Sequence, residues 1–255
     1  MATEQSGRGR IEVFEDFMGE ELPLAGSVDP GAGATAALLN FGSLVIRGEG
    51  VEDSTSGIVP VADSLNGVAR FTSASGTAGD AIILGTETCL RVDKMSPIVI
   101  ECRCKMPAVT NREIFIGLCG NFDDDQDEIL TGSTATLTLT AESDLCGFFF
   151  ESALSEALNW YMPYNGGATA GETDASEVVS SRLPVGDEYD ILRLEIDPNG
   201  TARWFINGVL EQTVVGAIST SVVMSAMVAV IYTASAVATL DVDYFYISAN
   251  RDWTV

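Results

Sequence analysis

The 255-residue chain contains no histidine. Histidine is the commonest general base near neutral pH and the commonest nitrogen ligand of zinc. Its absence excludes triad hydrolases, zinc enzymes with histidine ligands and pH switches built on imidazole. Mechanisms that use a pair of carboxylates stay open.

Basic residues are scarce, because 13 Lys and Arg stand against 37 Asp and Glu, for a formal net charge of −24. Such a surface repels phosphates and anionic lipids, so we expect neither nucleic acid nor a membrane as a partner. Hydrophobic residues make up 46% of the chain and charged residues 20%, which argues for a packed core and against disorder. A chain of this length is typical of one large β domain.

A long apolar signal segment is also missing at the N-terminus, so we expect the chain to fold in the reducing cytoplasm of a host cell.

Residues 212–240 carry no charge, but serine and threonine interrupt them throughout. The longest run without either, residues 226–232, is far shorter than the ~20 residues of a membrane-spanning helix. We therefore predict two buried strands, joined near residues 233–235.

Cysteine is present in an odd number, without a CxxC pair: Cys89, Cys102, Cys104, Cys119 and Cys146. This is neither a disulfide framework nor a zinc knuckle. In residues 97–106, PIVIECRCKM, an alternation of period two places Cys102 and Cys104 on the same face as Ile98 and Ile100. We expect both thiols to be small buried hydrophobic groups, with a single disulfide or a metal site as the alternatives.

Short strand patterns separated by Gly, Asn and Pro turns fill the chain, and no helical period exceeds about ten residues. The clearest pattern is LRLEIDPNGTARWFINGVLEQTVV, in which a DPNG turn and an NG turn link three strands. The strands are predicted at residues 11–17, 43–47, 68–72, 81–84, 97–106, 113–119, 135–140, 146–151, 158–164, 177–182, 189–197, 201–207, 210–215, 222–232 and 236–248. We predict an all-β, antiparallel two-sheet jelly-roll sandwich, as a single domain over residues 11–255.

Residues 1–10, MATEQSGRGR, are polar and carry Arg8 and Arg10 on an otherwise acidic chain. This composition predicts a short N-terminal arm, and the two arginines are candidates for its attachment to a partner. An unremarkable leader is the alternative interpretation.

Three segments resemble the concanavalin A-like lectin/glucanase superfamily, which includes laminin G-like modules. They are PIVIECRCKMP followed by EIFIGLCGN, DILRLEIDPNGTARWFINGVLEQTV, and the closing DVDYFYIS, and together they span roughly residues 97 to 248. The resemblance implies the fold and says little about function, because this sandwich serves lectins, hydrolases and structural modules alike.

A narrower resemblance is to jelly-roll structural proteins of tailed bacteriophages, on the opening EDF-x-G (Glu15 to Gly19) and the closing DYFxxSANR (Asp243 to Arg251). It implies a non-enzymatic virion protein, a capsid decoration or cement module that binds the major capsid protein or other virion proteins and forms a homo-oligomer. The alternative function is a carbohydrate-binding module of a tail fibre or cell-surface protein.

The carboxylates do not form the E-x-D-x-(x)-E strand that retaining glucanases of this fold carry. The string at residues 12–16 has the wrong spacing. Glu195 and Asp197 are one carboxylate short and run into the turn at residues 198–200, which Asp197 is expected to cap. We predict no catalytic residues.

The densest acidic run, residues 123–128, alternates Asp123, Asp125 and Asp127 in the manner of a calcium loop. The EF-hand pattern fails, because its sixth position is Glu128 instead of glycine. We expect no cofactor unless calcium binds here, and a solvated loop is the competing interpretation.

Aromatic residues followed by an Asn-Gly-Gly turn form the one pattern typical of a sugar-stacking platform. The candidate residues are Trp160, Tyr161, Tyr164 and Asn165. Against this, large rings in strands are more often part of a core.

Overall fold

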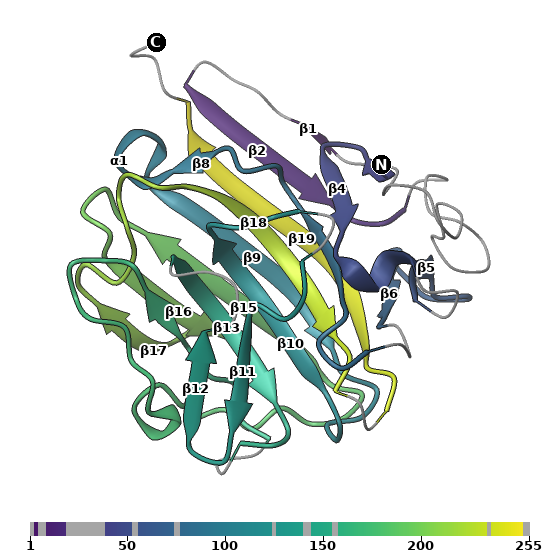
Figure 1. The fold of residues 1–255 in the computed structure, drawn as a ribbon. Coiled ribbons are helices and arrows are strands. Elements are labelled where there is room, and N and C mark those ends of the chain that lie inside the picture. Colours follow the sequence, from purple (N-terminus) through teal and green to yellow (C-terminus); the bar gives the residue numbers. More distant parts are fainter. Residues whose placement is uncertain are drawn as a thin grey trace.

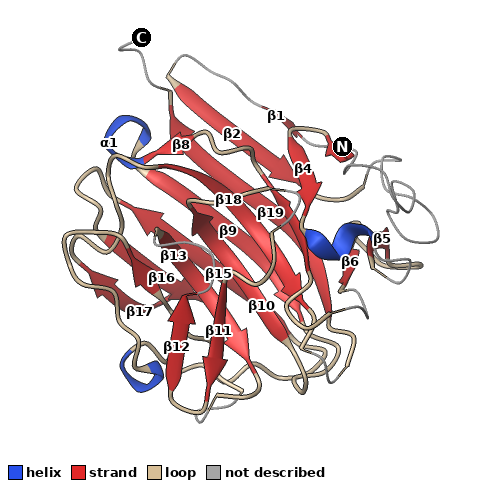
Figure 2. Ribbon diagram, viewed as in Figure 1, coloured by secondary structure: helices blue, strands red, loops and turns tan. Residues whose placement is uncertain are grey.

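The computed structural model describes residues 3–4, 9–18, 39–52, 56–73, 77–123, 126–139, 144–154, 158–233 and 236–251. Two large antiparallel sheets lie face to face in them, and a smaller hairpin lies outside the second sheet (Figure 1, Figure 2). The predicted all-β jelly-roll sandwich is confirmed.

The nine-stranded sheet contains, in spatial order, β1 (Thr3–Glu4), β2 (Arg10–Glu15), β19 (Thr239–Asn250), β9 (Ile98–Lys105), β15 (Tyr189–Ile196), β16 (Ala202–Ile206) and β17 (Val209–Val214), with β6 (Ala69–Thr72) and β5 (Gly57–Pro60) extending it beside β19. The eight-stranded sheet contains β14 (Tyr164–Asn165), β13 (Leu145–Glu151), β10 (Glu113–Cys119), β18 (Val223–Ile231), β7 (Ala81–Gly85), β4 (Leu44–Arg47) and β3 (Leu39–Phe41), and β8 (Leu90–Arg91) pairs with the start of β18. The separate hairpin is β11 (Leu130–Ser133) with β12 (Thr136–Leu139).

Helical structure in the described residues is limited to α1 (Val92–Met95) and two 3-10 turns, Glu49–Glu52 and Ala175–Glu177. No helix among them is long and apolar enough to cross a membrane. The uncharged stretch at residues 212–240 instead supplies β18, which is buried from its second residue onward, and the start of β19.

The alternation predicted for residues 97–106 is confirmed in β9. Cys102 and Cys104 are buried and face the space between the sheets together with Ile98 and Ile100. All five cysteines are free thiols, and Cys89 is the exposed one. The predicted disulfide alternative is therefore absent from the structure.

The two hairpins predicted from the DPNG and NG turns are confirmed as β15, β16 and β17. Asn207 and Gly208 both have positive φ values, 52° and 79°. Glycine and asparagine tolerate this conformation best, and it matches the twist of a two-residue hairpin. This turn brings Ile206 of β16 opposite Val209 of β17, whereas the DPNG turn joins β15 to β16 in the register in which Leu194 lies opposite Trp204.

The strand predicted at residues 158–164 is only partly formed, as a bridge at Tyr161 and the two-residue strand β14 that begins at Tyr164. The strand predicted at residues 177–182 is wrong, because the structure has only a single bridge there, at Val179. Tyr161 exchanges both backbone hydrogen bonds with Phe149 at 2.7 and 2.8 Å, so this segment lies alongside β13 at the edge of the eight-stranded sheet. Its apolar side chains alternate, with Trp160 and Met162 in the core between the sheets and Tyr161 on the outer face of the eight-stranded sheet.

The main core lies between the two sheets. Trp204 of β16 is fully buried in it, and its indole N–H donates to the Gly147 carbonyl of the opposite sheet at 2.7 Å. This hydrogen bond satisfies the one polar atom of a large apolar ring, so the ring contributes its burial without an unpaired donor.

Candidate functional site

The outer face of the nine-stranded sheet carries charged and aromatic side chains. We call this surface the charged face. It is formed by Glu12 and Phe14 of β2, Tyr244 and Tyr246 of β19, Glu101, Arg103 and Lys105 of β9, Arg193 and Glu195 of β15, and Arg203 and Phe205 of β16. These residues alternate with the core residues of the same strands, so the sheet itself brings them into rows.

Hydrogen bonds and ion pairs link neighbouring rows at the centre of the charged face. The Tyr244 hydroxyl donates to Glu101 at 2.7 Å, and Arg193 pairs with both Glu101 and Glu195 at 3.0 and 2.8 Å. Partial burial and the adjacent Glu101 carboxylate raise the pKa of Tyr244 well above its ordinary value. The hydroxyl therefore stays a neutral donor at any physiological pH.

Two buried aspartates of β19 hold further cations on this face. Asp241 is almost fully buried and accepts a bidentate pair of hydrogen bonds from Arg70, at 2.6 and 2.8 Å. Asp243 pairs with Arg103, whose guanidinium also lies over the Tyr189 ring, 3.8 Å from its centroid. Bidentate and stacked arginines are the strong form of such contacts, so these side chains are fixed in place.

The charged face is nearly neutral, although the chain as a whole carries −24. Six of the 13 basic side chains lie on it or at its margin, and seven acidic side chains pair with them. The remaining surface therefore carries almost all the net charge. An acidic partner meets the least repulsion at the charged face.

The outer face of the eight-stranded sheet is apolar and covered, and we call it the covered face. Phe115, Phe149 and Met227 form a second hydrophobic cluster there, and Leu130 and Leu137 of the β11–β12 hairpin pack on it. Figure 1 shows this hairpin lying across the sheet. In the described part of the chain, this sheet face is therefore occupied by the chain's own side chains.

The predicted sugar platform is not formed as a surface. Trp160 is 1% exposed and Tyr161 is fully buried, so neither ring can stack on a sugar. Tyr164 and Asn165 are half-buried on the edge strand β14. Next to Asn165, a groove of about 450 Å³ is lined by small and hydroxyl-bearing residues: Gly166, Gly167, Ala168, Pro198, Asn199, Ile218, Ser219, Thr220 and Ser221.

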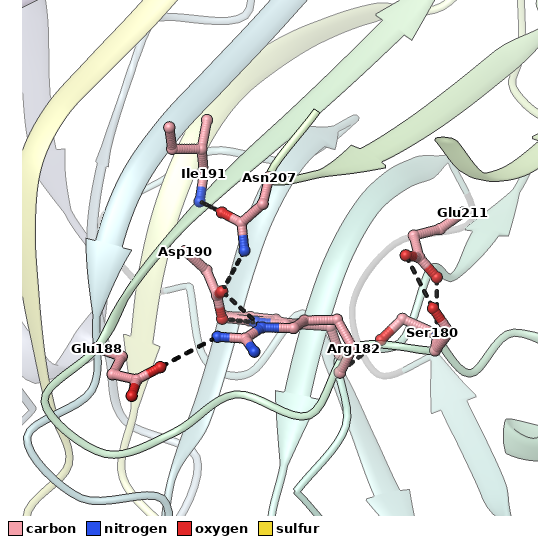
Figure 3. A network of polar contacts seen from close by, with 9 residues as sticks. Ser180, Arg182, Glu188, Asp190, Ile191, Asn207 and Glu211 are labelled. Carbon is pink, nitrogen blue, oxygen red and sulfur yellow. Dashed lines mark hydrogen bonds and ion pairs between the residues drawn. The ribbon is translucent and has the colours of Figure 1, made fainter. Parts of the chain in front are cut away.

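Trp160 belongs to a polar network around a buried carboxylate (Figure 3). Asp190, 2% exposed, accepts from the Trp160 indole at 3.2 Å, from Arg182 at 3.0 Å and from Asn207 at 2.8 Å. The Asn207 side chain in turn accepts from the Ile191 amide at 2.8 Å. The network ties Trp160, beside β13 of the eight-stranded sheet, to β15 of the nine-stranded sheet, so its role is positional.

The other sequence candidates are placed as follows. Asp123 is half-buried, Asp127 is exposed, and Asp125 lies outside the described residues. Within the described part of the chain, no three acidic or cysteine side chains are grouped so that they could hold a metal. Arg10 opens β2, pairs with Glu12 at 2.9 Å and donates to Ser248 at 3.0 Å, and Arg8 lies outside the described residues.

The carboxylates considered for hydrolysis are engaged elsewhere. Glu195 pairs with Arg193, and Asp197 pairs with Arg203 at the turn, where its carbonyl also accepts from the Gly200 amide at 2.9 Å. Sequence reasoning missed a different pair, Glu113 and Glu151, which lie opposite each other on β10 and β13. Only the strand register reveals this pair, because the two residues are far apart in the sequence.

Comparison with solved structures identifies the fold. The sequence matches no protein-family model and shows no significant similarity to a curated protein. A protein of unknown function from Shewanella oneidensis MR-1 aligns with a TM-score of 0.61 at 13% identity, over 99% of this chain and 92% of that one. A Bacillus licheniformis β-glucanase aligns with a TM-score of 0.50 at 12% identity, over 95% and 99% of the two chains. The carbohydrate recognition domain of Emp46p also aligns with a TM-score of 0.50 at 12% identity, over 80% and 88%. The chain therefore has the concanavalin A-like lectin/glucanase fold.

Proposed function

We propose that this chain is a non-enzymatic structural module of a virus particle, which decorates or cements the assembled shell by binding the major capsid protein or other virion proteins. The observation that carries the proposal is the contrast between the two outer faces. The covered face is filled by the chain's own hairpin, whereas the charged face is broad, ordered and nearly neutral. Such a face suits attachment to another folded surface.

The opening and closing segments support the viral context by their resemblance to phage jelly-roll proteins, EDF-x-G at residues 15–19 and DYFxxSANR at residues 243–251. In the fold the two segments meet at the register pair of Glu15 with Phe245, where the pairing of β2 with β19 ends. The N-terminal strands therefore form one margin of the charged face. A module that binds only the assembled shell stabilises it by mass action.

Attachment is tested by adding back purified protein to particles that lack it and measuring co-sedimentation. Arg193→Glu places an unpaired negative charge in the middle of the charged face, so we expect binding at least about tenfold weaker. Lys94→Glu in α1 changes the net charge equally outside that face and is the matched control. Deletion of residues 1–10 should also weaken binding while the sandwich stays folded. Equal binding of Arg193→Glu and wild type would overturn the proposed face.

The non-enzymatic part of the proposal has its own test. We expect no turnover of β-glucans or other polysaccharides by the purified protein. Turnover of a polysaccharide that Glu195→Gln or Glu151→Gln abolishes would contradict the proposal. Each substitution replaces a carboxyl with an amide of the same shape, so the loss of turnover would be assigned to that carboxyl group.

A carbohydrate-binding module is the second candidate function, favoured by the hydroxyl-lined groove beside Asn165. Side-chain hydroxyls and amides are suitable partners for sugar hydroxyls. Binding on a glycan array, with and without calcium, that Asn199→Ala removes would support this function. Trp160→Ala is uninformative here, because Trp160 is part of the core.

A further inference from the structure

Two glutamates face each other beneath the β11–β12 hairpin. Glu113 of β10 and Glu151 of β13 are register partners in the eight-stranded sheet, 3% and 7% exposed. Directly opposite residues on antiparallel strands have Cβ atoms about 5 Å apart. Phe115 and Phe149, two residues further along each strand, belong to the covered face, so both carboxyl groups point to that face.

The hairpin touches this pair through its backbone. The Gly132 amide of β11 donates a short hydrogen bond to Glu151. A Cβ atom at Gly132 would lie 2.7 Å from the Leu154 side chain, so the strand approaches closely here and a larger residue would require Leu154 and Glu151 to shift. Thr134, at the hairpin turn, bridges to Leu154. The pair is therefore a point at which the hairpin is fastened to the sheet.

Neither carboxyl group has a cation as a partner among the described residues, and Glu113 Oε1 accepts no hydrogen bond. The neighbouring Arg112 directs its guanidinium to the carbonyls of Thr110, Asn111 and Val237 instead. Glu128, in the segment that leads into β11, adds a further negative charge nearby.

The adjoining strands bring no positive charge either. Ile231 of β18 lies next to Glu113, and Ala81 of β7 lies next to Ile231. The titratable residues one position beyond them are Tyr232 and Asp80, and the Asp80 carboxylate accepts from the Thr77 amide at 2.6 Å.

Two adjacent buried carboxylates cannot both be charged without a large penalty. Burial, then the charges of Glu151 and Glu128, raise the pKa of Glu113 well above its ordinary value. Burial also raises the pKa of Glu151 to about 7, even though the Gly132 amide opposes this shift. A proton held between the two groups would give Glu113 the hydrogen bond that its free oxygen lacks.

We propose that Glu113 and Glu151 hold a shared proton that fastens the β11–β12 hairpin over the covered face, and that release of this proton to solvent loosens the hairpin. This inference concerns the hairpin alone and is independent of what the charged face binds. In the loosened hairpin both carboxyl groups meet water and return to an ordinary pKa near 4.5. The closed hairpin holds a proton that the loosened one lacks, so closure is strongest below about pH 4.5 and weakens as the pH rises through about 7.

Hydrogen exchange of the hairpin amides tests this device in the full-length protein. After division by the intrinsic exchange rates, protection of Leu130, Gly132 and Leu137 should fall about tenfold per pH unit between pH 5 and 7, about 300-fold in all for one proton shifted from 4.5 to 7. Amides of β9, in the other sheet, are the reference for global unfolding, so they should stay better protected than the hairpin amides at every pH.

Glu113→Gln and Glu151→Gln supply the decisive comparison, because each replaces a carboxyl with a neutral amide of the same shape. We expect either variant to flatten the pH dependence, whereas Glu177→Gln, at an exposed carboxyl, should leave it unchanged. Two variants are used so that the failure of one to fold leaves the other as a test. Protection independent of pH in the wild type would overturn the proposal, as would restoration of protection by calcium chloride at pH 8, which would assign the pair to a cation.

Discussion

The two sheets of this sandwich differ in their outer faces. Each sheet buries one face against the other sheet, and its second face points outward. In the nine-stranded sheet the outer face is exposed to water and carries paired charges and tyrosines. The eight-stranded sheet has apolar side chains on both faces, and the outer face packs against the β11–β12 hairpin and against Tyr161 and Val178. The comparison separates the surface that is free to bind from the surface that holds the fold together.

The largest expected difference between the faces is in core packing. Phe149→Ala, on the covered face, should lower the free energy of unfolding by about 3–5 kcal/mol, because it leaves a cavity under the hairpin. Phe14→Ala, on the charged face, should cost less than about 1 kcal/mol, since the ring is 36% exposed. Urea denaturation of both variants measures the contrast. Similar losses for the two would show that the covered face is not a true core.

The Asp190 network should give the next largest effect. Asp190→Ala leaves the Trp160 indole, Arg182 and Asn207 without their common acceptor, so we expect a loss of about 3 kcal/mol. Glu211→Ala removes contacts to Ser181 at the exposed edge and should cost less than about 1 kcal/mol. Thermal and urea unfolding compare the two. A small effect of Asp190→Ala would mean that Trp160 is held in place by its apolar contacts alone.

The pH dependence of global stability follows from Glu151. Its pKa is raised in the folded protein, so it contributes stability below about pH 4.5 that is lost as the pH rises to about 7. The urea midpoint of Glu151→Gln should therefore fall less than that of the wild type between pH 5 and 8. Parallel curves for the two proteins would rule out a titrating Glu151.

The smallest effect is expected on the charged face. Arg193→Ala removes two ion pairs, but both are partly exposed and screened by salt, so stability should fall by less than about 1 kcal/mol. The loss should shrink further at 1 M salt. A loss of several kcal/mol would place the charged face among the elements that hold the fold.

The sequence predicted the fold wherever a local pattern was enough. Alternation placed Cys102 and Cys104 in the core, and the Asn207–Gly208 turn set the hairpin register. It was less accurate where tertiary contacts decide, because residues 158–164 pair with β13 only at the Tyr161 bridge and at the start of β14 instead of forming one continuous strand.

The candidate site was harder to predict for the same reason. The pairing of Glu113 with Glu151 depends on the register of β10 and β13, and the pairing of Arg193 with Glu101 depends on that of β15 and β9. No local spacing encodes either pair. The hydrogen bond of the Trp160 indole likewise depends on Asp190, which lies 30 residues away.

The proposed role in a virus particle is tested most directly by the copy number of this protein in purified particles. Quantitative mass spectrometry against the major shell protein gives that number. A decoration or cement module should be present at a copy number close to that of the shell subunit. Complete absence from the particles would contradict the proposed function, and a few copies per particle would contradict the decoration role and favour a tail or fibre component.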